Sequence, residues 1–278
     1  MVAELSGNHL GQLDRAIALV NAAADAGADA IKIQTFNPEQ MTEPHVVVET
    51  GPWAGHNLMD LYRQTMWPRD WHAPIFDAAA KRGMIAFSSV FHPDDVDFLE
   101  TLGCPIYKIA SFELTDLTLI KHVASKGKDM ILSTGMATKD EIMWAMISTL
   151  ALPRRKVTLL KCTSAYPALT RDANLATMPN MAVEFDVEVG LSDHTIGNTC
   201  AVVATVLGAS VIEKHLTLDR SEGGPDSAFS AEPLEFAAMV QACKNAATAI
   251  GSVRYGPTTH EAPQFVLRRT PGGKRGIS

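Results

Sequence analysis

Residues 13–36 read LDRAIALVNAAADAGADAIKIQTF, and this stretch decides the fold class. Its first part, Leu13–Ala26, carries apolar residues at helical spacing, and its last part, Ala30–Phe36, is a short apolar run typical of a buried strand. Another short apolar run, Val2–Leu5, precedes the helical stretch. A strand, a helix and a strand in this order predict a β-α-β unit, in which the two strands are parallel.

The same alternation continues along the chain until it has produced eight units. The expected strands are Val2–Leu5, Ala30–Phe36, Ile85–Val90, Ile106–Ser111, Met130–Gly135, Val157–Thr163, Val187–Asp193 and Ser210–Leu218. The expected helices are Leu13–Ala26, Asp70–Arg82, Asp94–Leu102, Leu117–Lys126, Lys139–Leu150, Asn174–Glu184 (the weakest pattern), Gly197–Leu207 and Pro233–Gly251. Eight such units in about 250 residues are typical of a (β/α)8 TIM barrel, an α/β fold.

An open, doubly wound parallel sheet is the structural alternative. That fold typically places a glycine-rich phosphate loop after its first strand. Here the first strand is followed by Ser6-Gly7-Asn8-His9, which is no such loop. The segment Asn37–Arg69 interrupts the second unit with several prolines and glycines, and we predict that it is a long loop that serves as a lid or binding loop.

The composition is that of a globular protein, with 278 residues, 46% of them hydrophobic and 20% charged. We expect the barrel to span residues 1–255 and the basic, turn-rich tail 256–278 to be poorly ordered. The formal net charge of −7 argues against nucleic-acid and anionic-membrane partners. Because a signal peptide and long apolar spans are absent from this sequence, the chain is expected to be cytoplasmic, and its four scattered cysteines to be reduced.

Polar residues gather where the strands are expected to end, which in a barrel is the substrate mouth. They are Glu4, Asn8, His9, Lys32, Gln34, Ser88, Ser89, Lys108, Ser111, Glu113, Ser133, Ser164, Tyr166, Ser192, His194, Glu213 and His215. A lysine inside a strand is unfavourable unless it meets an anion, so Lys32 and Lys108 beside several hydroxyls predict a phosphate site. One lysine could instead pair with Glu4 or Glu113, and serines at strand ends often only cap the next helix.

His194 and His215 end neighbouring strands, so both imidazoles could bind one metal ion. Each of them could equally be a hydrogen-bonded core residue. The residues alone leave these two interpretations open.

The same residues carry a resemblance to the sialic acid synthase family. The strings that match its motifs in order are AELSGNH at 3–9, GADAIKIQT at 27–35, YKIASFE at 107–113, LSTGM at 132–136, KCTSAYP at 161–167, VGLSDHT at 189–195, VIEKH at 211–215 and GPD at 224–226. Within the family, the PRDWH string at 68–72, ASFE at 110–113, Lys161 and PDSAFS at 225–230 are more similar to pseudaminic acid synthases than to N-acetylneuraminate synthases.

The resemblance implies a condensation of phosphoenolpyruvate with an acetamido-sugar aldehyde, with 2,4-diacetamido-2,4,6-trideoxy-L-altrose as the expected sugar and pseudaminic acid and phosphate as products. It implies that His194 and His215 bind a divalent metal, Mn2+ or Mg2+, and that Glu4 and Glu113 position water or move protons. The positions expected to bind phosphoenolpyruvate are Lys32, Ser89, Lys108, Ser111, Ser133, Ser164 and Ser192. Those expected to contact the sugar are Gln34, Tyr166 and Asp226.

The sequence departs from the family pattern at its ends. Members of the family continue into a small C-terminal antifreeze-like domain that closes over the partner's active site in a dimer. We expect that domain to be absent here, and the N-terminal extension before the first strand as well. The sequence therefore leaves open whether the chain forms a homodimer. Without the closing domain, the sugar would be less well oriented in the active site.

Three alternatives remain beside pseudaminic acid synthesis. The first is N-acetylneuraminate synthesis from N-acetylmannosamine. The second is a condensation that makes octulosonate or heptulosonate phosphates, although Asp226 with Tyr166 suits a neutral sugar better than a phosphorylated one. The third is a truncated barrel that binds phosphoenolpyruvate and metal without turnover.

Overall fold

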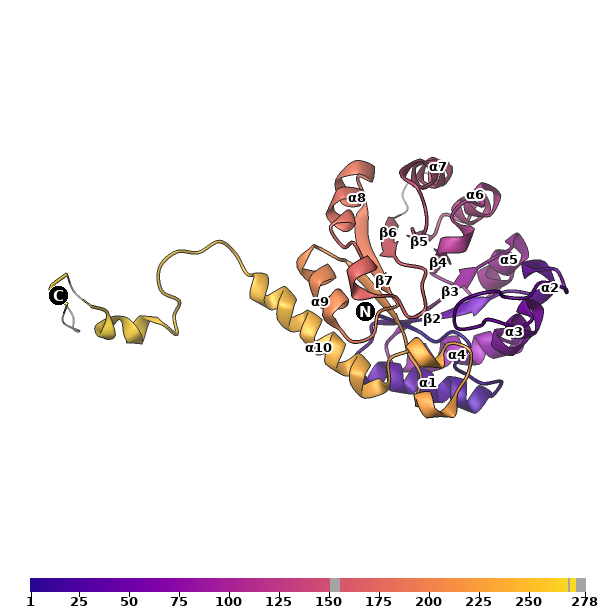
Figure 1. The fold of residues 1–278 in the computed structure, drawn as a ribbon, viewed down its shortest axis with the longest axis horizontal. Helices are drawn as coiled ribbons and strands as arrows, with labels where there is room; N and C mark the ends of the chain where they lie inside the picture. Colours follow the sequence, from indigo (N-terminus) through magenta and orange to yellow (C-terminus); the bar gives the residue numbers. More distant parts are fainter. Residues whose placement is uncertain (151–155, 270, 274–278) are drawn as a thin grey trace. The chain divides into compact units, whose positions relative to one another are not determined.

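A computed structural model describes residues 1–150, 156–269 and 271–273, and the compact unit Met1–Ala247 contains a (β/α)8 barrel. Eight parallel strands pair in chain order, β8 pairs with β1 to close the ring, and helices lie around the outside of the strands (Figure 1). The strands are β1 (Val2–Glu4), β2 (Ala30–Thr35), β3 (Ile85–Val90), β4 (Ile106–Ile109), β5 (Asp129–Ser133), β6 (Val157–Cys162), β7 (Glu188–Asp193) and β8 (Val211–His215). The predicted fold class is confirmed.

A helix follows each strand, and two short helices interrupt the second unit. The helices are α1 (Leu13–Asp25), α2 (Pro38–Met41), α3 (Leu58–Thr65), α4 (Arg69–Lys81), α5 (Pro93–Thr101), α6 (Leu117–Ser125), α7 (Lys139–Thr149), α8 (Thr177–Phe185), α9 (Thr199–Val206) and α10 (Pro233–Ile250). Capping residues fix several of their starts. Thr138 and Glu141 form a reciprocal capping box at α7, and His92 with Asp95 does the same at α5.

Every expected strand and helix is present, and the errors lie at the ends. The fourth strand was expected to reach Ser111, but β4 ends at Ile109 because the chain turns into the 3-10 helix η1 (Ser111–Glu113). The eighth was expected to reach Leu218 but ends at His215. Both differences shorten a strand at its carboxyl end, where the chain turns out of the barrel.

The segment 37–69 is not the continuous loop that its prolines and glycines predict. Asn37 caps α2 by accepting a hydrogen bond from the Glu39 backbone N–H, and Asn57 caps α3 by accepting one from Asp60. These caps satisfy amide groups that a helix start leaves without intrahelical partners. The turn-forming residues between the two helices nevertheless remain irregular apart from a short bridge between Val47 and Asn57.

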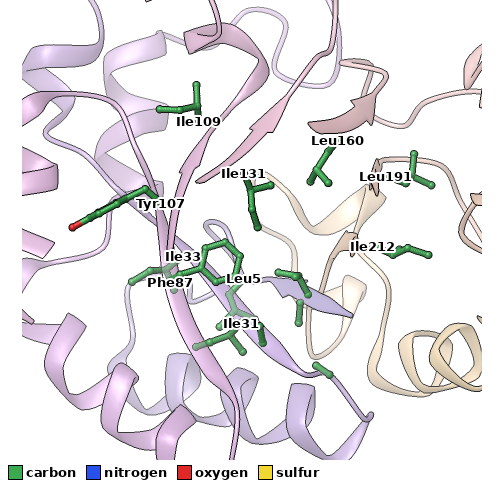
Figure 2. Packing of buried hydrophobic residues seen from close by; sticks show 14 of the residues in the cluster. Leu5, Ile31, Ile33, Phe87, Tyr107, Ile109, Ile131, Leu160, Leu191 and Ile212 are labelled. Atoms are coloured by element: carbon green, nitrogen blue, oxygen red, sulfur yellow. The ribbon is translucent and has the colours of Figure 1, made fainter. Parts of the chain in front are cut away.

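The apolar core occupies both faces of the barrel wall (Figure 2). On β2, Ile31 and Ile33 alternate with Lys32, so they face the surrounding helices while Lys32 faces the barrel interior. The register carries Phe87, Ile131 and Leu160 to the interior face of their strands. Burying an aliphatic or aromatic side chain of this kind stabilises the fold by about 1.5–3 kcal/mol.

The register also brings the polar strand ends together. Glu4 lies beside Lys32 on one side and His215 on the other, and Ser89 lies beside Lys108. Residues paired across a ladder share a face, so these side chains point into the same end of the barrel. The fold therefore assembles the residues that the sequence singles out.

A second compact unit, Thr248–Ser278, contains the 3-10 helix η5 (Ala262–Leu267). The tail expected to be poorly ordered begins within this unit, and its residues 270 and 274–278 lie outside the described residues.

All four cysteines are free and buried. Among the described helices, none combines the length and the apolar character needed to cross a bilayer.

Gly190 in β7 provides a test of packing inside the barrel. A Cβ atom there would lie 2.2 Å from the Val211 carbonyl oxygen and 2.7 Å from Leu160 Cδ2. Gly190→Ala should therefore lower the free energy of unfolding by about 1–3 kcal/mol, measured by denaturant titration. The control is Gly272→Ala, because Gly272 has open space around it and is expected to be neutral. Equal stability of the two variants would contradict this packing constraint.

Candidate active site

The predicted site residues meet at one cavity of about 840 Å³ at the carboxyl ends of the strands. Those that line it are Lys32, Gln34, Ser89, Lys108, Ser111, Glu113, Ser133, Ser164, Tyr166, Ser192, His194, His215 and Asp226. Among the residues given a predicted role, Glu4 does not line the cavity and contacts Lys32 from behind. Asn8, His9 and Ser88, which were named only as strand-end residues, also lie outside the lining of this cavity. The segment 37–69 contributes to the wall, so its predicted role as a binding segment agrees with its position.

Two lysines and two glutamates form a buried charged cluster at the inner end. Lys108 Nζ donates to Glu213 Oε1 at 2.9 Å and Oε2 at 2.8 Å. Lys32 Nζ contacts Glu4, lies 3.6 Å from Glu213 Oε1, and donates to Ser89 Oγ at 2.9 Å. Each lysine thus already has a carboxylate partner, and Glu213 was named among the strand-end residues without a predicted role. Its signal in the sequence is its position two residues before His215, on the same face of β8.

The pKa values in this cluster follow from burial and charge. Burial opposes ionisation of Glu213, but the ammonium groups of Lys108 and Lys32 outweigh it and lower the pKa of this carboxyl. Burial also opposes the charge on Lys32, yet Glu213 and Glu4 raise its pKa overall. For Lys108, burial together with the neighbouring Lys32 lowers the pKa despite the contact with Glu213. The pKa of each group in the cluster therefore depends on the charges of its neighbours.

The imidazoles of His194 and His215 face each other with ring centroids 5.2 Å apart. His194 Nδ1 donates to the Thr163 carbonyl at 3.0 Å. His215 Nδ1 lies 2.8 Å from Ser6 Oγ, and that hydroxyl donates to Glu4 Oε1 at 2.8 Å, so it accepts from Nδ1. In its neutral form each ring consequently carries its lone pair on Nε2, as metal-ligating histidines do.

The two histidines differ in their pKa shifts. Burial and the neighbouring His194 lower the pKa of His215 well below its usual value, so this ring is neutral. Burial also disfavours charge on His194, but hydrogen bonding and charge at Cys162 outweigh it and raise its pKa. Within residues 1–150, 156–269 and 271–273, no three His, Cys, Asp or Glu side chains are grouped to form a complete metal site.

Two carboxyl groups at the cavity wall have raised pKa values. Burial raises the pKa of Glu113 to about 7, and burial raises that of Asp226 to about 6. Asp226 accepts a hydrogen bond from the Gly7 backbone N–H at 3.2 Å. Glu113 Oε2 and Ser133 Oγ are buried atoms without a hydrogen-bond partner among the described residues. Buried polar atoms of this kind are rare in folded proteins, and both face a cavity that could hold a polar ligand.

Gly135, directly after β5, lets two of the predicted hydroxyls converge. A Cβ atom there would lie 2.2 Å from Ser164 Oγ and 2.7 Å from Ser111 Oγ. The Gly135 backbone N–H donates to Ser111 Oγ at 3.0 Å. Ser192 Oγ lies 3.4 Å from Glu213 Oε1. Hydroxyls from separate strand ends thus surround the charged cluster.

Aromatic rings pack around the histidines, and two of them, Tyr166 and Trp53, line the cavity. Tyr166 packs on His194 with centroids 4.3 Å apart, and Phe229 packs on His215 at 5.0 Å. Trp53 packs on Tyr166 at 5.2 Å. Trp53 and Phe229 were not predicted as site residues, although each lies in a stretch that the sequence singled out, the segment 37–69 and the PDSAFS string.

Comparison with known proteins gives consistent results. The family model described as NeuB family matches residues 19–255. Pseudaminic acid synthase of Helicobacter pylori is 43% identical over 274 residues, which cover 96% of this chain and 81% of that protein. N,N'-diacetyllegionaminic acid synthase of Legionella pneumophila is 35% identical, with 97% of this chain and 78% of that protein covered.

One solved structure shares the fold over most of the chain. N-acetylneuraminic acid (sialic acid) synthetase from Leptospira borgpetersenii superposes with a TM-score of 0.83 at 30% identity. The superposition covers 95% of this chain and 88% of that chain. The similarity therefore extends over the whole barrel.

The charged cluster predicts a large effect of one substitution. Glu213→Gln leaves Lys108 buried with no carboxylate partner, and it should lower the free energy of unfolding by about 3–5 kcal/mol. The control is Glu188→Gln, which removes one partner of the exposed Lys156–Glu188 pair and should change stability by less than about 1 kcal/mol. Denaturant titration measures both variants. A loss for Glu213→Gln no larger than for Glu188→Gln would mean that the cluster does not depend on this charge.

Proposed function

Because this chain belongs to the NeuB family, we propose that it condenses phosphoenolpyruvate with the open-chain aldehyde of an acetamido sugar, releasing a nonulosonic acid and phosphate. The observation that carries the proposal is the convergence, in one cavity, of two lysines, several hydroxyls and two imidazoles. The lysines and hydroxyls suit an anionic phosphate ester, and the imidazoles suit a metal cation that activates a carbonyl group.

The sugar proposed is 2,4-diacetamido-2,4,6-trideoxy-L-altrose, which would give pseudaminic acid. Identity to the Helicobacter pylori pseudaminic acid synthase is 43%, whereas identity to the Legionella pneumophila legionaminic acid synthase is 35%. This difference supports pseudaminic acid over legionaminic acid as the proposed product. Gln34, Tyr166 and Asp226 would contact the sugar.

The ammonium groups of Lys32 and Lys108 would bind the phosphate and carboxylate of phosphoenolpyruvate. Both are buried and held in place by Glu213, so they need little reorganisation when an anion arrives. The hydroxyls that would complete this pocket are Ser89, Ser111, Ser133, Ser164 and Ser192. Ser133 Oγ, which has no hydrogen-bond partner among the described residues, would gain one from the ligand.

A divalent metal fits the residues present. His194 and His215 offer two Nε2 lone pairs whose directions are fixed by hydrogen bonds at Nδ1, and the remaining ligands would come from water and substrate. When bound there, Mn2+ or Mg2+ would supply Lewis-acid polarisation of the aldehyde carbonyl.

The residues then account for each bond change. The C3 carbon of phosphoenolpyruvate attacks the aldehyde carbon, the aldehyde oxygen takes up a proton from solvent water, and positive charge develops at C2. Water adds to C2 and gives one proton to the ionised Glu113 carboxylate, which leaves a hydroxyl on C2. The C2–O bond to the phosphate then breaks, phosphate leaves with the electron pair and takes up the remaining hydroxyl proton, and C2 becomes a ketone. Glu4 would act by holding Lys32 directly and His215 through Ser6.

A phosphate-release assay tests the proposal. With phosphoenolpyruvate and Mn2+, the diacetamido-trideoxy sugar should release phosphate faster than N-acetylmannosamine, and arabinose 5-phosphate should release none. Turnover of N-acetylmannosamine alone would favour N-acetylneuraminate synthesis. Turnover of arabinose 5-phosphate would favour a condensation of the heptulosonate or octulosonate phosphate type. Binding of phosphoenolpyruvate with no release from any sugar would reject the proposed function in favour of a barrel that binds without turnover.

His215→Ala should remove metal and activity together, because one of only two imidazole ligands is lost. Metal content after dialysis against Mn2+, measured by atomic absorption, should fall from about one ion per chain to well below one. The matched control is His122→Ala, because His122 pairs with Asp97 on the outer surface. Retention of one ion by His215→Ala would assign this histidine a structural role.

Glu113 gives a pH prediction whose sign follows from its proposed role as a base. Burial raises the pKa of Glu113 to about 7, so the carboxyl is protonated and unable to accept a proton below that pH. The value of kcat should therefore rise as pH increases through about 7 and level off above it. Glu113→Gln should lose this rise along with most of the rate. A rise that persists unchanged in the variant would belong to another group.

A further inference from the structure

The cavity has two chemically different parts. Its inner end carries the lysines, hydroxyls and imidazoles described above. Its outer wall, formed largely by the segment 37–69, is mainly apolar: it includes Met41, Val48, Pro52, Trp53, Leu58, Leu61 and Tyr62, with Thr50 and Thr65 as its hydroxyl-bearing threonines. A ligand that fills the whole cavity must therefore present a polar end and a less polar end.

Trp53 sits at the tip of a hairpin-like turn that holds it in place. The Val48 backbone N–H donates to the His56 carbonyl at 3.0 Å, and the Gly55 N–H donates to the Val48 carbonyl at 2.8 Å. These two bonds close the base of the turn that carries Trp53, so the position of this side chain is set by backbone structure.

The indole of Trp53 is also fixed from the opposite side of the cavity. Its Nε1 donates to the Pro225 carbonyl at 2.8 Å, and its ring lies 5.2 Å from Tyr166 and 6.1 Å from Phe229 by centroids. Three separate chain segments thus meet at one side chain. A half-buried tryptophan held in this way offers a rigid apolar surface with little ordering cost on ligand binding.

The aromatic wall begins at the imidazoles. Tyr166 contacts His194, Phe229 contacts His215, and both of these rings contact Trp53. A sugar whose aldehyde carbon faces the imidazoles would extend its far carbons along this wall. The substituents on those carbons would meet aromatic surface instead of hydrogen-bond donors.

We propose that Trp53 is a specificity-determining residue that selects sugars whose carbons remote from the aldehyde carry apolar groups, namely the methyl of a second acetamido group and a deoxy terminus. This inference rests on the proposed function, because it assumes that the aldehyde lies at the histidines. Hydroxyls at those carbons would lose water on entry without gaining partners from the wall, so a more hydroxylated sugar binds less well.

The test compares two sugars by titration calorimetry with Mn2+ present and without phosphoenolpyruvate, so that it does not depend on turnover. One sugar carries two acetamido groups and a 6-deoxy terminus, and the other is N-acetylmannosamine. In Trp53→Ala, the Kd of the first sugar should rise about tenfold and that of the second by less than about twofold. Trp53→Phe keeps an aromatic ring and should retain most of the preference.

The control is Trp144→Ala, since Trp144 is an exposed tryptophan on α7 away from the cavity. It should leave both Kd values unchanged, and thermal unfolding of all three variants checks that they fold. Equal losses for both sugars in Trp53→Ala and in Trp53→Phe would assign Trp53 a purely structural role and overturn the inference. A wild-type protein with equal Kd values for the two sugars would also overturn the inference. If the preference is present but no phosphate is released in the turnover assay, only the proposed function fails.

Discussion

The closure of the barrel at β1 is the constraint on which the rest of the site depends. Because β1 pairs with both β2 and β8, Glu4 lies in register with Lys32 on one side and with His215 on the other. Its carboxylate contacts Lys32 directly and reaches His215 through the Ser6 hydroxyl. One buried carboxylate therefore links the Lys32 ammonium group to the His215 imidazole, so the position of each depends on the other.

The charges at the inner end are balanced within the protein. Glu4 and Glu213 offset Lys32 and Lys108, and all four residues are no more than 4% exposed. Glu113 and Asp226 at the cavity wall have raised pKa values because of burial. This balance offsets the charges of the two buried lysines, and a hydrogen bond from a charged donor to an anion is stronger than one between neutral groups. The aromatic wall then extends from the reacting end to the part of the cavity that would hold the rest of the sugar.

Much of this arrangement could be predicted from the sequence, because the period-two pattern of strands states which residues share a face. Lys32 with Gln34 and Ser192 with His194 were placed correctly on that basis. Two kinds of feature could not be predicted. The pairing of Lys108 with Glu213 joins residues 105 positions apart, and no local spacing reveals which acid meets which lysine. Trp53 reaches the cavity only because the segment 37–69 folds back across it, and its helices α2 and α3 were hidden by prolines and glycines that normally indicate loops.

The central claim is that one cation bound by two imidazoles lies beside an anion held by two ammonium groups. A crystal structure with Mn2+ and phosphoenolpyruvate, recorded with the anomalous signal of manganese, tests it most directly. The account predicts a single anomalous peak within about 2.3 Å of the Nε2 atoms of both His194 and His215, with the phosphate in hydrogen-bond contact with Lys32 or Lys108. A manganese ion bound away from one of these rings, or a phosphate that contacts neither lysine, would contradict the account.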